Sequence, residues 1–267
     1  MKRLDQWLVD EGHFPSRERA RLAIMAGEVS VEGRGNDLKA GTRVRPGDRV
    51  TVSPRPRFVS RGGDKLEGVL ERWGIEVAGR LALDVGASTG GFTHCLLERG
   101  AARVICLDVG RGQLHWELRN HPGVTVMERT NVRHVRPEDL PFEPELVVAD
   151  LSFISLRLVF PVLGRLMVGG GELIALIKPQ FEAGRGKVGK KGVVRDPDVH
   201  REVLEAVAAA AAGCGFELLD LVPSPLRGAE GNIEYFGWWR RNEEAPPASP
   251  GAVEKAVREA WERSSGT

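Results

Sequence analysis

Seven short apolar segments recur between residues 81 and 241 of this chain of 267 residues, and segments with helical spacing separate most of them. The apolar segments are LALDV, RVICLDV, VTVME, ELVVAD, ELIALI, FELLDLVPS and NIEYFGWWRR. Intervening segments such as GGFTHCLLERG and ISLRLVFPVLGRLM are typical of helices packed on a sheet. The alternation predicts a doubly wound α/β fold in which helices cover both faces of a mostly parallel sheet.

Residues 1–57 precede this pattern and predict a separate, small α+β domain. Leu4, Trp7 and Leu8 lie on one face of a short helix, and Ser16 is a candidate N-cap of a second helix within PSRERARLAIMAG. EVSVEG and DRVTV alternate as short strands do, with the turn sequence RPGD between them. Two helices and a small sheet supply enough core for a small module only.

The same segment carries an excess of positive charge. It contains 12 Lys and Arg residues against 8 Asp and Glu residues, although the whole chain has a formal net charge of +1. Any nucleic-acid binding is therefore expected to depend on local patches. Arg17 and Arg21 are one turn apart and could reach neighbouring phosphates, and Arg3 is a further candidate for RNA binding. A solvated helix face explains these arginines equally well.

Proline and glycine mark the expected region boundaries. SPRPRFV is punctuated by proline and predicts a linker, and the amphipathic helix that follows in DKLEGVLERWG ends at Gly74. We expect a small domain at residues 1–57, the α/β domain at 58–241 and a flexible tail at 242–267. Val253, Val257 and Trp261 have helical spacing, so the tail is expected to contain a short, loosely docked helix.

Other features narrow the function classes. Cys95, Cys106 and Cys214 are far apart and form no CxxC pair, which favours reduced core thiols over a disulfide framework. The six histidines lack metal-ligand spacing, so no metal site is expected. No apolar run approaches the roughly 20 residues of a membrane-spanning helix, and the first residues do not resemble a signal peptide. We therefore expect a cytoplasmic protein.

The segment LALDVGASTGGFT predicts a cofactor loop, because a strand, a glycine-rich turn and a helix start let a ligand contact bare backbone at a helix N-terminus. Its spacing is D-x-G-x-x-x-G-G. Asp108 ends the next strand, where a carboxylate can bind both hydroxyls of an adenosine ribose, and Asn131 is a candidate contact for the adenine edge. Tight packing of strand and helix is the alternative explanation of the glycines. The candidate cofactor-binding residues are Asp84, Gly86, Ser88, Thr89, Gly90, Gly91, Phe92, Asp108 and Asn131.

Four charged residues stand at unusual places. Lys65 follows the double glycine of SRGGDKL, Asp150 and Lys178 end two apolar strands, and Glu234 interrupts GNIEYFGWW. Charge at the carboxyl end of a buried strand is costly unless it is paired, and ligands bind at this edge of open α/β sheets. A structural ion pair would explain any one of the four alone. As a set beside a cofactor loop, they predict a catalytic site.

The motifs SRGGDKL, DVGASTGGFT, VVADLSFISL, LIKPQFEAGRGKVGKKGVVRD and GNIEYF together resemble those of the TlyA family, historically called hemolysins. That family joins an RNA-binding domain of the ribosomal protein S-four type to an FtsJ-like methyltransferase. The resemblance implies a Rossmann-like class I methyltransferase fold with a seven-stranded sheet, S-adenosylmethionine as cofactor, and methylation of a ribose 2'-hydroxyl in 16S or 23S rRNA, with cytidine as the target. It also implies that Lys65, Asp150, Lys178 and Glu234 form the catalytic tetrad.

In such a site the ribose hydroxyl attacks the sulfonium methyl in line. Lys178 is the candidate base, or a cation that orients the hydroxyl, with Asp150 holding both and Lys65 and Glu234 in support. The double glycine before Lys65 would allow close backbone approach at the seam between the domains. The glycine-rich segment after Lys178 is either an ordinary solvated loop or a mobile clamp on RNA; the candidate RNA contacts in it are Lys187, Lys190 and Lys191.

Two other function classes stay open. One is a noncatalytic RNA-binding or ribosome-assembly factor that retains the fold, which would bind the cofactor without turnover. The other is a membrane-active protein, as the historical family name suggests, although the sequence has no lytic amphipathic segment. A pseudouridine synthase can carry the same small RNA-binding domain, but it would not need an adenosyl-binding loop.

Overall fold

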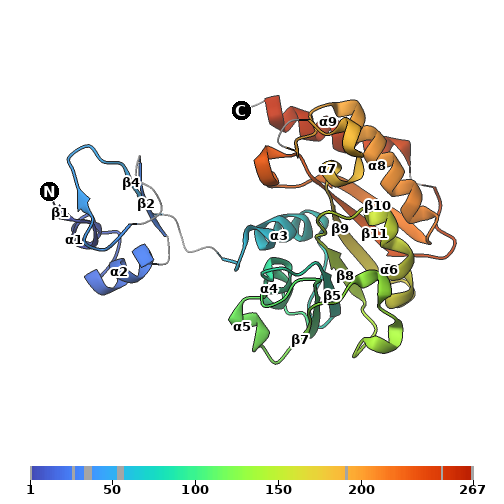
Figure 1. The fold of residues 1–267 in the computed structure, drawn as a ribbon, viewed down its shortest axis with the longest axis horizontal. Coiled ribbons are helices and arrows are strands. Elements are labelled where there is room, and N and C mark those ends of the chain that lie inside the picture. Colours follow the sequence, from blue (N-terminus) through green and yellow to red (C-terminus); the bar gives the residue numbers. More distant parts are fainter. Residues whose placement is uncertain are drawn as a thin grey trace. The chain divides into compact units, whose positions relative to one another are not determined.

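The structure is a computed structural model, and it describes residues 2–25, 28–32, 38–52, 57–189, 192–247 and 249–265. The chain forms two compact units, Met1–Arg57 and Phe58–Thr267 (Figure 1). Each unit has its own hydrophobic core.

The N-terminal unit packs two helices with short strands. The helices lie where the apolar spacing predicts them, and the Ser16 hydroxyl accepts a hydrogen bond from Arg19 N. The strands form two antiparallel pairs, β1 with β3 and β2 with β4. The elements are β1 (Lys2–Arg3), α1 (Leu4–Asp10), α2 (Arg17–Met25), β2 (Val29–Val31), β3 (Arg43–Val44) and β4 (Val50–Val52). The first pair is too short to leave an alternating pattern in the sequence, so it could not be predicted.

The second unit contains a seven-stranded sheet with the order β10-β11-β9-β8-β5-β6-β7. All pairs among β5 to β9 are parallel, and β11 runs antiparallel to both β9 and β10. The strands are β5 (Leu81–Val85), β6 (Arg103–Leu107), β7 (Val124–Met127), β8 (Leu146–Ala149), β9 (Glu172–Ile177), β10 (Phe216–Pro223) and β11 (Tyr235–Arg241). The predicted mostly parallel sheet of seven strands is confirmed.

Helices cover both faces of this sheet (Figure 1). Helices α3 and α4 pack with Ala82 in one apolar cluster, whereas α6, α8 and α9 pack with Leu83 and Val85 in the other. Neighbouring residues of β5 thus enter opposite clusters, because the side chains of a strand alternate between its faces. The helices are α3 (Arg61–Trp73), α4 (Gly91–Glu98), α5 (Trp116–Arg119), α6 (Phe160–Leu166), α7 (Pro179–Glu182), α8 (Pro197–Ala212) and α9 (Pro250–Ser265).

Helix α9 is more firmly packed than the loosely docked helix expected for the tail. Its residues Val253, Ala256, Val257 and Ala260 are at most 4% exposed and belong to the same cluster as α6 and α8. The guanidinium of Arg72 on α3 also bonds both carboxylate oxygens of Glu259 on α9. The helix is therefore a part of the core of the second unit.

The cysteines form no disulfide among the described residues, and the tryptophans of β11 pack within the second unit. The three cysteines are free thiols, of which Cys95 and Cys106 are buried and Cys214 is half-buried. Trp239 is fully buried, and Trp238 Nε1 donates to Glu172.

None of the helices within the described ranges has the length and apolar character needed to cross a bilayer.

Candidate active site

Three of the predicted site residues meet where adjacent parallel strands end. Asp84 lies in β5, Asp150 directly follows β8, and Lys178 directly follows β9. The register pairs Val85 with Ala149 and Ala149 with Ala175, so the carboxyl ends of these three strands lie side by side. This edge is where open α/β sheets bind ligands.

The four charged residues form two ion pairs. Lys65, in α3, donates to Glu234 Oε2 at 2.6 Å, and the two side chains are only 11% and 3% exposed. Lys178 Nζ lies 2.6 Å from Asp150 Oδ1. Each lysine therefore compensates one acid, which lowers the cost of placing these charges at a buried sheet edge.

Two polar residues that sequence reasoning missed connect these pairs to their surroundings. Gln180 donates from Nε2 to Glu234 Oε1 at 3.2 Å, and it stands two positions after Lys178. Lys178 Nζ also donates to Ser152 Oγ at 3.0 Å. A neutral amide and a hydroxyl give no sequence signal beyond their nearness to Lys178 and Asp150.

A cavity of about 550 Å³ opens at this edge, and its walls combine both parts of the predicted site. Lys65, Asp84 and Asp150 line it together with most of the glycine-rich loop. Arg61 and Arg227 also line it, which places positive charge at the same cavity. The loop residues in its wall are Gly86, Ala87, Ser88, Thr89, Gly91 and Phe92.

A second cavity, of about 440 Å³, adjoins the first and shares Gly86, Ser88 and Asp150 with it. Asp108 and Asn131 line only this second cavity. Asp108 is fixed by two backbone donors, since Oδ2 accepts from Ser88 N at 2.8 Å and Oδ1 from Gly110 N at 2.6 Å. The candidate cofactor residues thus divide between two adjoining cavities.

The glycines of the loop have different roles. Gly86 has a φ of 86°, and a Cβ there would lie 2.5 Å from the carbonyl oxygen of Asp150, so this position requires glycine. A Cβ at Gly90 would instead meet Leu118 at 2.3 Å, and one at Gly91 would meet Ser60 Oγ at 2.3 Å. Packing explains Gly90, in line with the alternative explanation of the glycines, whereas Gly86 lines both cavities.

Asp84 is buried at the base of the first cavity. Its Oδ2 accepts hydrogen bonds from the Thr93 hydroxyl at 2.7 Å and from Thr93 N at 3.0 Å. Its Oδ1 has no hydrogen-bond partner among the described residues. Burial raises the pKa of Asp84 to about 7, and the nearby charge of Asp150 acts in the same direction. The site therefore contains a carboxyl group that titrates near neutral pH.

Gly63, the second glycine before Lys65, permits close packing within the second unit. A Cβ at Gly63 would lie 2.2 Å from the Phe58 ring, and the nearest neighbour of one at Gly62 would be Phe92, at 3.5 Å. The first turn of α3 therefore lies close to α4, which places Lys65 over the strand ends. These contacts are all internal to this unit.

Phe153 is an exposed aromatic residue beside the second cavity. It is 90% exposed, has a φ of 65°, and its ring centroid lies 4.9 Å from that of Phe181. Sequence reasoning did not single it out. Its place in the short segment directly after a strand end, beside Asp150, was the available signal.

The basic loop after Lys178 is partly described. Lys187 forms an ion pair with Glu202 on α8, while Lys190 and Lys191 lie outside the described residues. The end of the loop is anchored by the buried residues Asn232 and His200, which bond Val194 N and Val194 O, respectively. Whether this loop contacts RNA stays a prediction.

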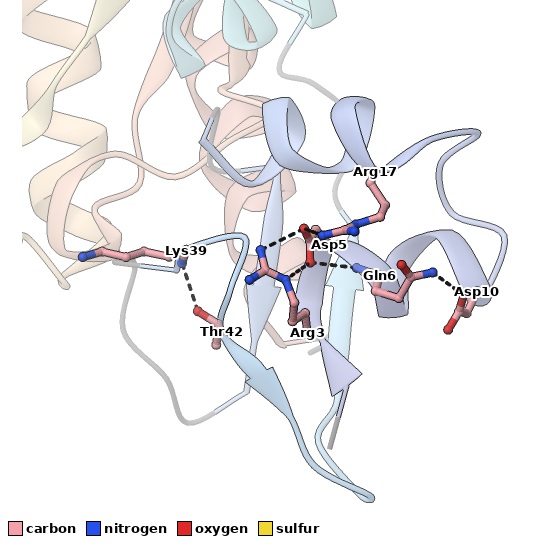
Figure 2. A network of polar contacts seen from close by, with 7 residues as sticks. All are labelled: Arg3, Asp5, Gln6, Asp10, Arg17, Lys39 and Thr42. Carbon is pink, nitrogen blue, oxygen red and sulfur yellow. Dashed lines mark hydrogen bonds and ion pairs between the residues drawn. The ribbon is translucent and has the colours of Figure 1, made fainter.

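The three arginines predicted to bind RNA lie in the N-terminal unit. Arg3 and Arg17 both donate to the carboxylate of Asp5, a residue that sequence reasoning did not single out (Figure 2). Arg21 is exposed on α2. Within the described part of the chain, no cluster of His, Cys, Asp and Glu side chains could hold a metal ion.

Comparison with known proteins identifies both units. Residues 58–241 match the FtsJ-like methyltransferase family, and residues 2–50 match the S4 domain. The 16S/23S rRNA (cytidine-2'-O)-methyltransferase TlyA of Mycobacterium tuberculosis is 45% identical over 96% of this chain and 97% of its own length. Hemolysin A of Brachyspira hyodysenteriae is 40% identical over 88% of this chain and 98% of its own length.

A solved structure named as a hemolysin, from Streptococcus thermophilus, has a similar fold. Its TM-score is 0.79 at 38% identity, with 99% of this chain and 97% of that chain covered. The family match covers more than half of the chain, and the resemblance seen in the sequence motifs is confirmed. This chain belongs to the TlyA family, in which an S4 domain precedes an FtsJ-like methyltransferase domain.

Proposed function

We propose that this protein transfers a methyl group from S-adenosylmethionine to a ribose 2'-hydroxyl of ribosomal RNA, with a cytidine of 16S or 23S rRNA as the target. The observation that carries the proposal is the Lys178–Asp150 ion pair at the edge of a cavity that Lys65 and the glycine-rich loop also line. The names of the relatives support the choice of RNA and of cytidine. As an enzyme that acts on ribosomal RNA, the protein is proposed to work in the cytoplasm.

The residues of the two adjoining cavities suit S-adenosylmethionine. Asp108 and Asn131 would hold the adenosine part in the second cavity, where carboxylate and amide oxygens can accept from ribose hydroxyls and the adenine edge. Asp84 would face the amino-acid part, because its buried Oδ1 lacks a partner among the described residues and can accept from an ammonium group. When bound, this cofactor supplies an electrophilic methyl group.

The polar residues of this chain would then position the attacking hydroxyl. Lys178 Nζ donates to Ser152 Oγ and lies against Asp150, an arrangement that supports a role as a cation orienting oxygen atoms over a role as a base. Asp150 would accept the hydrogen bond of the ribose hydroxyl, align it, and take up its proton as the methyl group passes from sulfur to the hydroxyl oxygen. Lys65 lines the same cavity, and Glu234 would hold it in place. Positioning of this kind supplies much of the rate of a bimolecular transfer.

The test is transfer of radiolabelled methyl to ribosomal subunits and naked rRNA by the wild type and by Lys178→Ala. We expect label in RNA of the wild-type reaction, resistance of one site to alkaline cleavage, and loss of both in the variant. Lys255→Ala is the matched control, because this lysine also faces an acid, Asp220 at 3.7 Å, but lies on α9 and is 54% exposed. Cofactor binding without label on any of these RNAs would overturn the proposal in favour of a noncatalytic factor.

A further inference from the structure

We propose that Asp5 is a positioning residue for RNA binding, whose buried carboxylate holds the guanidinium groups of Arg3 and Arg17 together as a preformed site for an RNA phosphate. The inference rests on the proposed function, because it takes RNA as the ligand of the N-terminal unit. Its new element is the acid, which would promote the binding of a polyanion.

The carboxylate of Asp5 is surrounded by donors (Figure 2). Oδ1 accepts from Arg3 Nε and from Gln6 N, both at 3.0 Å. Oδ2 accepts from Arg3 Nη2 at 3.1 Å and from Arg17 Nη2 at 2.8 Å. A carboxylate offers about four acceptor positions, so these bonds use its capacity. Asp5 is 4% exposed, and its charge is directed into the unit.

The shared oxygen brings together two cations from different elements. Arg3 belongs to β1 and Arg17 to α2, yet an Nη2 atom of each lies within 3.1 Å of Asp5 Oδ2. Two guanidinium groups this close repel each other unless an anion lies between them. One carboxylate offsets one of the two positive charges, so the cluster keeps a net positive charge.

Both arginines keep donors for a ligand. Their side chains are 47% and 53% exposed. A guanidinium has five N–H donors in a planar fork, and the bonds to Asp5 use two from Arg3 and one from Arg17. The remaining donors suit a phosphate, which guanidinium groups bind through paired N–H bonds.

The site has a fixed base. Leu4 N donates to Thr42 O at 2.7 Å and Asp5 N donates to Ala40 O at 3.1 Å, so the backbone that carries the carboxylate is tied to a neighbouring turn. Lys39 N donates to Thr42 Oγ1 within that turn (Figure 2). Side chains that are held before binding lose less conformational entropy when a ligand arrives. The hydrogen bond from Arg3 lowers the pKa of Asp5 to about 2, so Asp5 is ionised at neutral pH. We call this carboxylate and the guanidinium groups of Arg3 and Arg17 the clamp.

A third arginine adds to this face. Arg43 lies directly opposite Arg3 in the β1–β3 pair, and residues at paired positions leave a sheet on the same side. Arg43 is exposed, so a third positive charge lies on the same side of this pair as Arg3.

The experiment compares Asp5→Asn with the wild type as full-length proteins, using fluorescently labelled 16S and 23S rRNA transcripts as probes over a range of salt concentrations. Simple electrostatics predicts tighter binding, because the substitution removes a negative charge. The clamp predicts the opposite change. The affinity for RNA should be about five- to tenfold weaker, and the slope of log affinity against log salt concentration should fall by the equivalent of about one phosphate contact. In methyl transfer, the KM for RNA should rise while kcat and cofactor affinity stay the same.

Asp10→Asn is the matched control. Asp10 lies on the same helix, pairs with Lys2 and accepts a hydrogen bond from Gln6 Nε2, and its side chain is 31% exposed. Its substitution changes the charge equally and leaves the bonds from Arg3 and Arg17 to Asp5 in place. We expect unchanged or slightly tighter binding. If folded Asp5→Asn binds RNA as tightly as Asp10→Asn, the inference is wrong even though the proposed function stands. A wild type that neither binds nor methylates these RNAs would overturn both.

A second pair of variants covers the case in which Asp5→Asn fails to fold. Arg3→Lys and Arg17→Lys keep the charge but lose the two-pronged fork. We expect each to weaken RNA binding, and the double variant to lose less than the two single losses combined, because both arginines serve one site. Wild-type affinity in both folded lysine variants would contradict the clamp.

Discussion

Lys178 Nζ and Asp150 Oδ1 lie 2.6 Å apart across the carboxyl ends of two adjacent parallel strands, β9 and β8. Each pair reaches the first cavity through one member, Asp150 or Lys65, but Asp150 is 26% exposed whereas Glu234 is only 3% exposed. Substitution in the Lys178–Asp150 pair should therefore reduce methyl transfer, whereas substitution in the Lys65–Glu234 pair should also reduce stability.

Removal of Lys65 should destabilise the second unit. Lys65→Met leaves the carboxylate of Glu234 buried with Gln180 as its remaining donor among the described contacts, and breaking a buried pair in this way costs about 3–5 kcal/mol. The double variant Lys65→Met/Glu234→Gln should recover most of this stability but no methyl transfer. Urea denaturation and the transfer assay measure the two effects. Equal stability of the single and double variants would contradict this reading, and Lys255→Met is the exposed control.

Gly86→Ala should abolish cofactor binding and reduce stability. A methyl group there would lie 2.5 Å from the carbonyl oxygen of Asp150, in a backbone conformation with a φ of 86°. Gly79→Ala is the control, because Gly79 has a φ of 77° but a methyl group on it would have no atom of the described residues within 4 Å. It should cost about 1 kcal/mol from backbone strain alone. Isothermal titration calorimetry with S-adenosylmethionine measures cofactor binding by both variants. Wild-type affinity of Gly86→Ala would show that the site tolerates a methyl group at this position.

The stability of the second unit should fall as pH rises through the titration of Asp84. Its folded pKa is about 7 against an ordinary value of 3.8, so the folded state holds this proton more tightly than the unfolded state does. The free energy of unfolding therefore begins to fall near pH 4, and this loss of stability is complete above pH 7. Asp84→Asn should remove this part of the pH dependence, as measured by denaturation between pH 5 and pH 8. Parallel curves for the two proteins would show that Asp84 is ionised throughout.

Val257→Asp should destabilise the second unit by more than about 2 kcal/mol, because it buries a carboxylate without a partner. The neighbouring substitution Arg258→Asp is the control, since this side chain is 71% exposed and surface changes usually stay within about 0.5 kcal/mol. Thermal unfolding separates them. If the two variants have equal melting temperatures, α9 is loosely docked after all.

Much of the second unit was predictable from the sequence because its signals are local. Apolar strands alternating with helices are enough to give a parallel sheet, and topology then brings Asp84, Asp150 and Lys178 to one edge. The partner of each lysine was not predictable. Lys65 and Glu234 are 169 positions apart, and their pairing depends on how closely α3 approaches the strand ends.

The features that were missed depend on packing between distant segments. The spacing of apolar residues in α9 was visible, but its burial depends on a cluster that α6 and α8 build elsewhere. The contact that a Cβ at Gly90 would make with Leu118 is another example, because the sequence of the loop does not reveal it. Asp5 is one acid in a basic segment, and its importance lies in the two guanidinium groups that meet at its oxygen.

The wall shared by the two cavities has a consequence for the order of events. Gly86, Ser88 and Asp150 border both, so a cofactor with its adenosine part in the second cavity and its amino-acid part beside Asp84 would complete a surface of the first. If RNA bound first, the first cavity would lack the surface that the cofactor supplies, and Asp150 would not align the target ribose. Steady-state kinetics should therefore show compulsory order, with the cofactor binding before RNA and leaving after it.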